Sequence, residues 1–346
     1  MSEPILVVHI GAGNQSLARK NKYIGLIKKS LSTQQILNAS QVLERSSLTN
    51  TGYGSALNLE GEVECDSSYV IACRGSNQVE MGAFYNVRHE YPISETIDVW
   101  HRLNQLYQPG GKLGNVGLSR PVLVNYDSVK HLVSSRADIE SGSRDSLVSP
   151  KNMEIYRAYK DKGLVDYNQD VTDTIGLIEI KSEKTSIMTS SGGNFFKLPG
   201  RIGCAGVIGA AISHRVQDNH IAISCMCSGN GEDIIMMSLA RSIADGLIQL
   251  NENGYDYAET MVQIITQESS KISLTSVNNS NEKIVYVGAI CVIDDLQTNK
   301  KVLVYCHSTE SFFFGFQKGN NEPEVILSTL GTSPKLGTYC RGEFRI

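Results

Sequence analysis

The sequence has no long hydrophobic run and no segment typical of a secretion signal. Nowhere do about 18 apolar residues follow one another, the length that crosses a bilayer as a helix. The N-terminus, MSEPILVVHIGAG, has no basic stretch ahead of a long apolar one. We therefore expect a soluble intracellular protein, located in the cytoplasm or the nucleus, with no membrane partner.

Several motifs that are common in enzymes are also missing. The sequence contains no GxGxxG, no GxxxxGK[ST] and no GxSxG, which removes the simplest dinucleotide, nucleotide and α/β-hydrolase interpretations. The eight cysteines include no CxxC pair and the seven histidines no HExxH motif, so we expect neither a metal nor a cofactor. Cys225 and Cys227 lie in an apolar strand, and we expect them to face opposite sides of it. A net charge of −4 gives no reason to expect a nucleic-acid partner.

The chain does carry enough apolar material for a sizeable core, 41% of 346 residues. Alternating or continuous apolar patterns predict strands over 4–10, 62–72, 174–180, 185–193, 220–229, 283–294 and 301–309. Apolar residues at helical spacing predict helices around 24–31 and over 33–46, 231–250 and 257–269. Blocks of strands and helices alternate in both halves, which favours a layered α+β or α/β fold over a doubly wound sheet.

The stretch QDVTDTIGLIEI, residues 169–180, raises a chemical question. A serine-rich segment with few apolar residues, from 134 to about 172, ends where Thr174 begins a strand. A threonine hydroxyl is a weak nucleophile, but the free amine of an N-terminal threonine can act as its base. Cleavage before Thr174 would create that amine. The ordinary alternative is that Asp173 and Thr174 are simply a polar start to a strand. Glycine-rich turns after several strands add places where backbone N–H groups can bind an anion.

Six stretches occur in order along the chain: VHIGAGNQS, SLTNTGYGSALNLEGEVECDSS, DTIG, TSSGGNFFKLPGRIG, CSGNGE and CHSTESFFFGF. Together they resemble the plant-type asparaginase branch of the N-terminal nucleophile hydrolases, and within it the threonine aspartases, or taspases. The resemblance covers most of the chain outside the linker. It implies a single α+β domain, 1–346, folded as a four-layer αββα sandwich and assembled as a homodimer of αβ units.

The same resemblance implies a precursor that cleaves itself between Asp173 and Thr174. The products would be an α chain of 1–173, with a mobile linker over 134–172, and a β chain of 174–346. The implied roles are the nucleophile for Thr174, a supporting hydroxyl for Ser191, oxyanion donors for Ser228 and Gly229, and substrate binding for Arg201, Gly231 and Arg19.

One departure bears on the substrate. Asparaginases of this branch have an Asp three residues after the arginine, where it pairs with the α-ammonium of the substrate, and here that position is Cys204. A thiol suits a peptide bond better than a free amino acid. We therefore predict an endopeptidase that cuts protein substrates after Asp. The alternatives are an asparaginase or isoaspartyl dipeptidase of the same fold, and a scaffold protein that never splits before Thr174.

Overall fold

The computed structural model describes the chain outside residues 1–2, 75–77, 134–146, 163–173, 251–255 and 332. Its strands are β1 Ile5–Gly13, β2 Cys65–Cys73, β3 Val79–Val87, β4 Leu123–Asn125, β5 Ile175–Ile180, β6 Lys184–Ser191, β7 Ile212–Gln217, β8 Ile221–Gly229, β9 Val287–Asp295, β10 Lys301–His307, β11 Ser311–Lys318, β12 Glu324–Thr329 and β13 Cys340–Arg345. Its α-helices are α1 Lys20–Leu31, α2 Ile36–Glu44, α3 Pro92–Tyr107, α4 Tyr126–Val133, α7 Pro150–Lys162, α8 Gly231–Met237, α9 Leu239–Leu250 and α10 Tyr257–Ser269. Short 3-10 helices are η1 Leu17–Arg19, η2 Gly52–Gly54, η3 Gly114–Val116 and η4 Cys204–Gly206.

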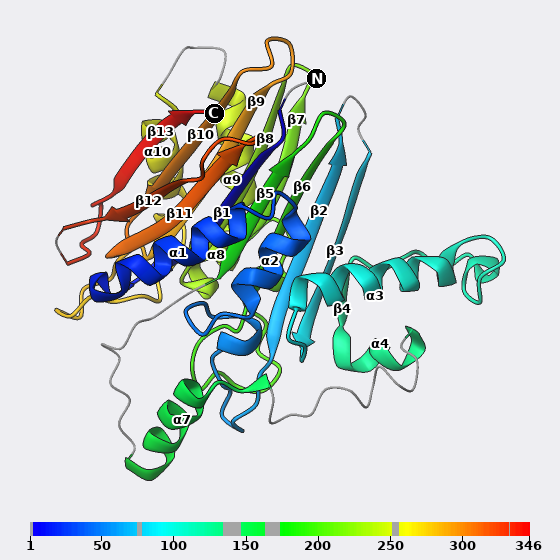
Figure 1. Cartoon of the computed structure of the whole chain (residues 1–346), viewed down its shortest axis with the longest axis horizontal. Coiled ribbons are helices and arrows are strands. Elements are labelled where there is room, and N and C mark those ends of the chain that lie inside the picture. The colour runs from blue at the N-terminus through cyan, green and yellow to red at the C-terminus, as the bar shows by residue number, and fades with distance from the viewer. Residues whose placement is uncertain (1–2, 75–77, 134–146, 163–173, 251–255, 332) are drawn as a thin grey trace.

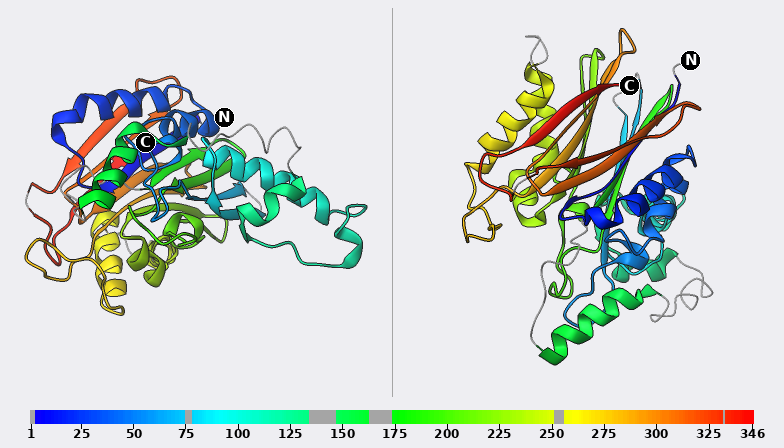
Figure 2. Two further views of the ribbon diagram at one scale, coloured as in Figure 1. Left: turned by 90° about the horizontal axis from the view of Figure 1, so that it is seen from below. Right: turned by 60° about the vertical axis from the view of Figure 1, so that its left-hand side comes forward.

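The described strands form two sheets that lie against each other, an eight-stranded mixed sheet and a five-stranded antiparallel one (Figure 1). The eight-stranded sheet has the order β12-β11-β1-β5-β6-β2-β3-β4, and the five-stranded sheet has the order β13-β10-β9-β8-β7. Helices α1, α2 and α3 contact the first sheet, whereas α9 and α10 contact the second (Figure 2). The structure thus has the mixed helix and strand content that the sequence predicts.

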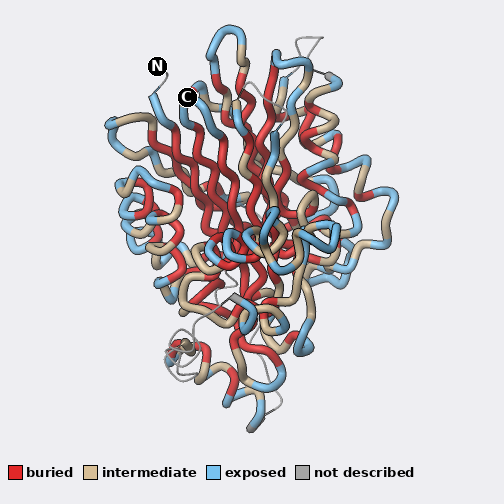
Figure 3. The backbone as a smooth tube through the Cα atoms, turned by 90° about the vertical axis from the view of Figure 1, so that its right-hand side faces the viewer, coloured by how far each residue is buried: buried red, intermediate tan, exposed pale blue. Residues whose placement is uncertain are grey.

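Strand β1 shows how one segment supplies two cores. All nine of its residues are buried. Successive side chains in a strand point to opposite faces. Accordingly, Leu6 and Val8 pack in the cluster under α1 to α3, and Ile5 and Val7 pack in the cluster between the sheets. Figure 3 shows that buried residues continue through the strands of both sheets. A strand buried on both faces reads as a continuous apolar run, as PILVVHI does.

Two expectations are wrong in detail. The predicted helix over 231–250 is two helices, because Ser238 between them has a left-handed φ of +47° that ends α8. Cys225 and Cys227 face the same side of β8, with their Sγ atoms 4.0 Å apart, because residues two apart in a strand share a face.

The described part of the predicted linker, residues 147–162, contains α7. The Asn152 side chain donates to the carbonyls of Gly54 and Ser55, at 2.9 and 2.7 Å. The Tyr156 hydroxyl donates to Leu59 O at 3.2 Å. Asp173 and the rest of the linker, 134–146 and 163–173, lie outside the described residues, so the cleavage point and the predicted mobility stay predictions.

Candidate active site

Thr174 lies at the end of the larger sheet, directly before β5. Strands β5 and β6 are antiparallel, with Ile175 paired to Ser190. Continuing that register by one residue brings Thr174 level with Ser191, and Ser191 itself pairs with Asp66 on β2. Paired residues of neighbouring strands share a face. Thr174, Ser191 and Asp66 therefore lie in a row across three strands, and all three are buried.

Ser191 begins a tight turn that leaves its hydroxyl hydrogen for another partner. Its Oγ accepts a hydrogen bond from Gly193 N at 3.1 Å. A hydroxyl has one donor and two acceptor positions, so this bond does not use its hydrogen. Asn50 supports the turn, because its side chain donates to Gly193 O at 2.7 Å and its carbonyl accepts from Gly192 N at 2.7 Å. Ser191 is thus a fixed hydroxyl beside Thr174.

Ser228 and Gly229 end β8 in the second sheet. Ser228 Oγ accepts from Ala12 N at 2.9 Å across the two sheets, which again leaves the hydroxyl hydrogen for another partner. Gly229 has a φ of +126°, and a Cβ there would lie 2.3 Å from Tyr286 O. Only glycine fits this position, so the chain can turn sharply toward Gly231 at the start of α8.

The loop between β6 and η4 carries Arg201. Its Nε and Nη2 both donate to Oε1 of Glu232, at 2.9 and 2.6 Å. A Cβ on Gly193, Gly203 or Gly231 would come within 2.7 to 2.9 Å of a guanidinium nitrogen. The three glycines therefore form a close cradle around the arginine, and Gly231 is one of them.

Cys204 is the first residue of η4, directly after that loop, and is 3% exposed. Its Sγ lies 4.0 Å from Oγ1 of Thr174. Because η4 also contacts α8, the loop that carries Arg201 is brought next to both Thr174 and Gly231. The structure therefore groups these sequence-predicted residues at one end of the two sheets.

Two charged residues that the sequence analysis missed support this group. Asp66 is 1% exposed, and its Oδ2 accepts from Gly203 N at 2.6 Å. Burial raises the pKa of Asp66 to about 6, against the opposing effect of Lys197, the Gly203 bond and Arg201. Lys197 is buried and donates to Glu64 O. An acidic residue inside a strand of small and apolar neighbours, EVECDSS, was the signal available for Asp66.

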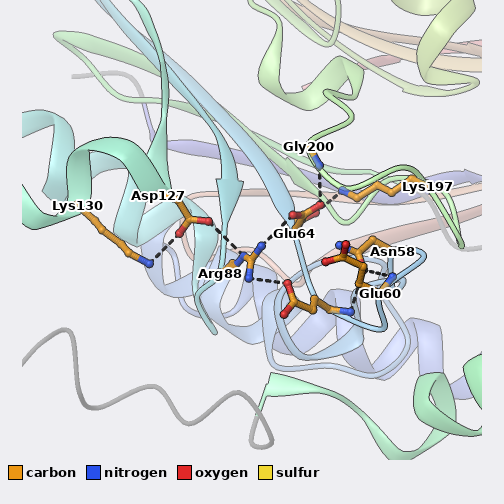
Figure 4. Close-up of polar contacts among 9 residues, drawn as sticks. Asn58, Glu60, Glu64, Arg88, Asp127, Lys130, Lys197 and Gly200 are labelled. Carbon is orange, nitrogen blue, oxygen red and sulfur yellow. Dashed lines mark hydrogen bonds and ion pairs between the residues drawn. The ribbon is translucent and has the colours of Figure 1, made fainter.

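Glu64 links this support to an outer ion-pair network that Figure 4 shows. One carboxylate oxygen of Glu64 accepts from Gly200 N at 3.1 Å, and the other lies 3.0 Å from Arg88. Arg88 also pairs with Glu62 and with Asp127 at the start of α4. The network ties the loop before Arg201 to β3 and α4.

A second buried network lies on the other face of the sheet. Glu44 accepts from Ile93 N and from the Ser190 hydroxyl, both at 2.9 Å, and Ser190 also bonds Thr51 at 2.8 Å. Complete burial raises the pKa of Glu44 to about 8. This network fixes the strand end that carries Ser191.

Arg19 is the last residue of η1 and is half-buried. Its predicted contact with substrate stays a prediction. Among the described residues, no group of three or more His, Cys, Asp or Glu side chains is arranged to hold a metal ion. No described helix is long and apolar enough to cross a bilayer.

Comparison with known proteins finds a similarity to one family. A profile described as Asparaginase matches residues 125–279, a stretch that contains every predicted site residue except Arg19. Over this stretch the chain is similar to asparaginases. The plant-type L-asparaginase of Thermococcus kodakarensis is 25% identical over 70% of this chain and 74% of its own length. That of Pyrococcus abyssi is 24% identical over 86% of this chain and 88% of its own.

A further asparaginase relative is the isoaspartyl peptidase/L-asparaginase of Bos taurus, 29% identical over 69% of this chain and 75% of its own length. Among solved structures, the PP2C phosphatase domain of SpoIIE from Bacillus subtilis matches at 14% identity over 52% of this chain and 66% of that one. Its TM-score of 0.21 supports no argument about the fold. These relatives are named as asparaginases and as an isoaspartyl peptidase, which favours the asparaginase or isoaspartyl dipeptidase alternative over the predicted endopeptidase.

Proposed function

We propose that this homologue of asparaginases is a self-processing hydrolase that uses Thr174 to hydrolyse an amide bond of an aspartyl compound. The observation that carries the proposal is the strand register that sets Thr174 level with Ser191, next to the loop that carries Arg201. We also propose that the two sheets and their helices form the four-layer sandwich of N-terminal nucleophile hydrolases, paired as a homodimer.

In the proposed reaction, cleavage before Thr174 first frees its amine. The amine takes the proton from the Thr174 hydroxyl, whose oxygen attacks the amide carbonyl. The Ser228 hydroxyl and the Gly229 N–H donate to the oxyanion that forms. The amine leaving group takes the proton, and water then hydrolyses the ester, releasing the acid and restoring Thr174. Arg201 binds a carboxylate of the substrate through its planar fork.

The asparaginase relatives support asparagine and isoaspartyl dipeptides as the first candidate substrates. One observation favours a second candidate. Cys204 lies next to Thr174 in space, and its thiol offers an α-ammonium group no charged partner. This favours an endopeptidase that binds the aspartyl side chain at Arg201 and attacks the main-chain carbonyl that follows it.

Self-cleavage is the first test. Denaturing mass spectrometry of the purified full-length protein should find two chains, 1–173 and 174–346. A Thr174→Ala variant should stay one chain of 37.9 kDa, because it has no hydroxyl to attack. Thr266→Ala, a matched change on the exposed side of α10, should still split. A folded wild type that stays whole would remove the hydrolase proposal and favour the scaffold alternative.

The substrate is tested next with the processed protein. Ammonia release from asparagine and cleavage of an isoaspartyl dipeptide would support the first candidate. Cleavage after an internal Asp of a peptide, with no release of ammonia from asparagine, would support the second. An Asn-for-Asp peptide is the control, since it lacks the carboxylate that Arg201 would bind.

A further inference from the structure

Three glycines pack so closely against the Arg201 guanidinium that it can occupy only one position. Hypothetical Cβ atoms on Gly193 and Gly203 would lie 2.9 and 2.7 Å from Nη1, and one on Gly231 would lie 2.9 Å from Nη2. The side chain is 15% exposed. A ligand must therefore come to the arginine, because the arginine has little space to move toward a ligand.

Glu232 occupies the donors that a ligand would need. A single oxygen, Oε1, accepts from both Nε and Nη2 of Arg201. The Glu232 side chain is 44% exposed and stands in the first turn of α8. Because Arg201 is fixed and the Glu232 side chain is half open to solvent, Glu232 can rotate away without disturbing the glycine cradle.

The charged groups around Arg201 carry a net positive charge that one further carboxylate can balance. Asp66 lies on the Nη1 side, is closed off from solvent and accepts from Gly203 N. Lys197 lies close to Asp66 and lowers its pKa, and Arg201 does so too. Two cations and one buried anion sum to a single positive charge. Either Glu232 or a substrate carboxylate can balance it, whereas both together would leave an excess negative charge.

We propose that Glu232 is a specificity-determining residue that competes with the substrate for Arg201. It fills the guanidinium fork in the empty site, and only a ligand carboxylate displaces it. A neutral ligand in the same place would have to break the ion pair and offer no charge in return. The inference rests on the proposed function, because it names the group through which that site selects an acidic ligand.

The test compares wild type with Glu232→Gln, which keeps the size of the side chain and removes its charge. We expect KM for the cleaved aspartyl substrate to fall by roughly two- to fivefold, the worth of a partly exposed ion pair, with kcat within about twofold. The dissociation constant of succinate, measured by thermal shift, should fall by the same factor. Uncharged succinamide should bind neither protein measurably.

Glu268→Gln is the matched control, since Glu268 pairs with Lys271 at 2.7 Å on the surface of α10 and should change neither value. Glu232→Ser is a second variant in case the first folds poorly. A KM or succinate dissociation constant that rises or stays constant in Glu232→Gln would overturn the inference, as would succinate binding to neither protein. If no protein cleaves any aspartyl substrate, the proposed function fails, while the succinate comparison still decides the role of Glu232.

Discussion

At the scale of single residues, Cys204 stands where the resemblance to asparaginases leads us to expect an Asp. Its thiol lies 4.0 Å from the Thr174 hydroxyl and is almost fully buried. Any group at this position faces whatever part of the substrate lies beside the nucleophile. The side chain at 204 should therefore decide whether that part is a free ammonium group or a neutral peptide nitrogen.

Cys204→Asp should convert the site toward free amino acids. A carboxylate beside Thr174 offers the α-ammonium a charged hydrogen bond, worth about 1.5 to 3 kcal/mol, so KM for asparagine should fall about tenfold or more. Cleavage of an Asp-containing peptide should weaken, because the added charge is then buried without a partner. Cys204→Ser controls for loss of the thiol. Equal kinetics for the Asp and Ser variants with both substrates would contradict this view.

At the scale of elements, α7 connects the linker to the loops around the site. Asn152 is 4% exposed and supplies two carbonyls, those of Gly54 and Ser55, with donors. Further along, the ring of Tyr159 stacks on Phe196 with centroids 3.9 Å apart. Helix α7 is thus bound to the glycine-rich loop 49–64 and to the loop that leads to Arg201.

Asn152→Ala should loosen this helix. It leaves two buried carbonyls without their side-chain donor, which costs about 1 to 3 kcal/mol. Hydrogen exchange of the amides in 150–160 and 52–56 should speed up, while exchange in β5 and β6 stays as in wild type. Glu154→Ala, an exposed change in the same helix, is the control. Exchange that is unchanged relative to Glu154→Ala would mean that α7 is held by other contacts.

The elements also differ in how far sequence patterns could find them. Helix α10 coincides with the predicted 257–269, because its apolar positions recur at helical spacing and Asp256 caps it. The break at Ser238 was missed, since the apolar period continues across it and its positive φ has no glycine signal. Helix α3 begins with Pro92 and was also missed, although proline in the first turn is a usual start.

At the scale of the whole molecule, five buried or half-buried titratable groups set how stability depends on pH. Burial lowers the pKa of His9 to about 3 and those of His214 and His307 to about 4. Below about pH 6.5 the unfolded chain takes up protons at these positions and the folded chain does not, so folding weakens as pH falls. Glu44 and Asp66 act in the opposite sense, because their raised pKa values, about 8 and about 6, mean that the folded chain holds their protons longer.

The unfolding free energy should therefore be largest near pH 6.5. Below it, the three histidines outweigh the two carboxyl groups, each histidine contributing a slope of up to about 1.4 kcal/mol per pH unit. Above it, loss of the Glu44 proton weakens folding as pH rises toward about 8. Urea unfolding across this range measures the curve, and His214→Gln should flatten its acid side. A stability that still rises steadily from pH 6.5 to 8 would contradict the assignment to Glu44.

The sequence alone located seven of the thirteen described strands and several helices, because apolar period and burial are local properties of a segment. It also pointed to Thr174, Ser191, Arg201 and Gly229 through stretches that resemble a family. Only the tertiary structure decided which groups surround them. The row of Thr174, Ser191 and Asp66 depends on the register of three strands, and the competition for Arg201 depends on a fold that sets Glu232 against a loop 31 residues away. Such pairings arise from packing between distant segments, and a local sequence pattern holds no information about that packing.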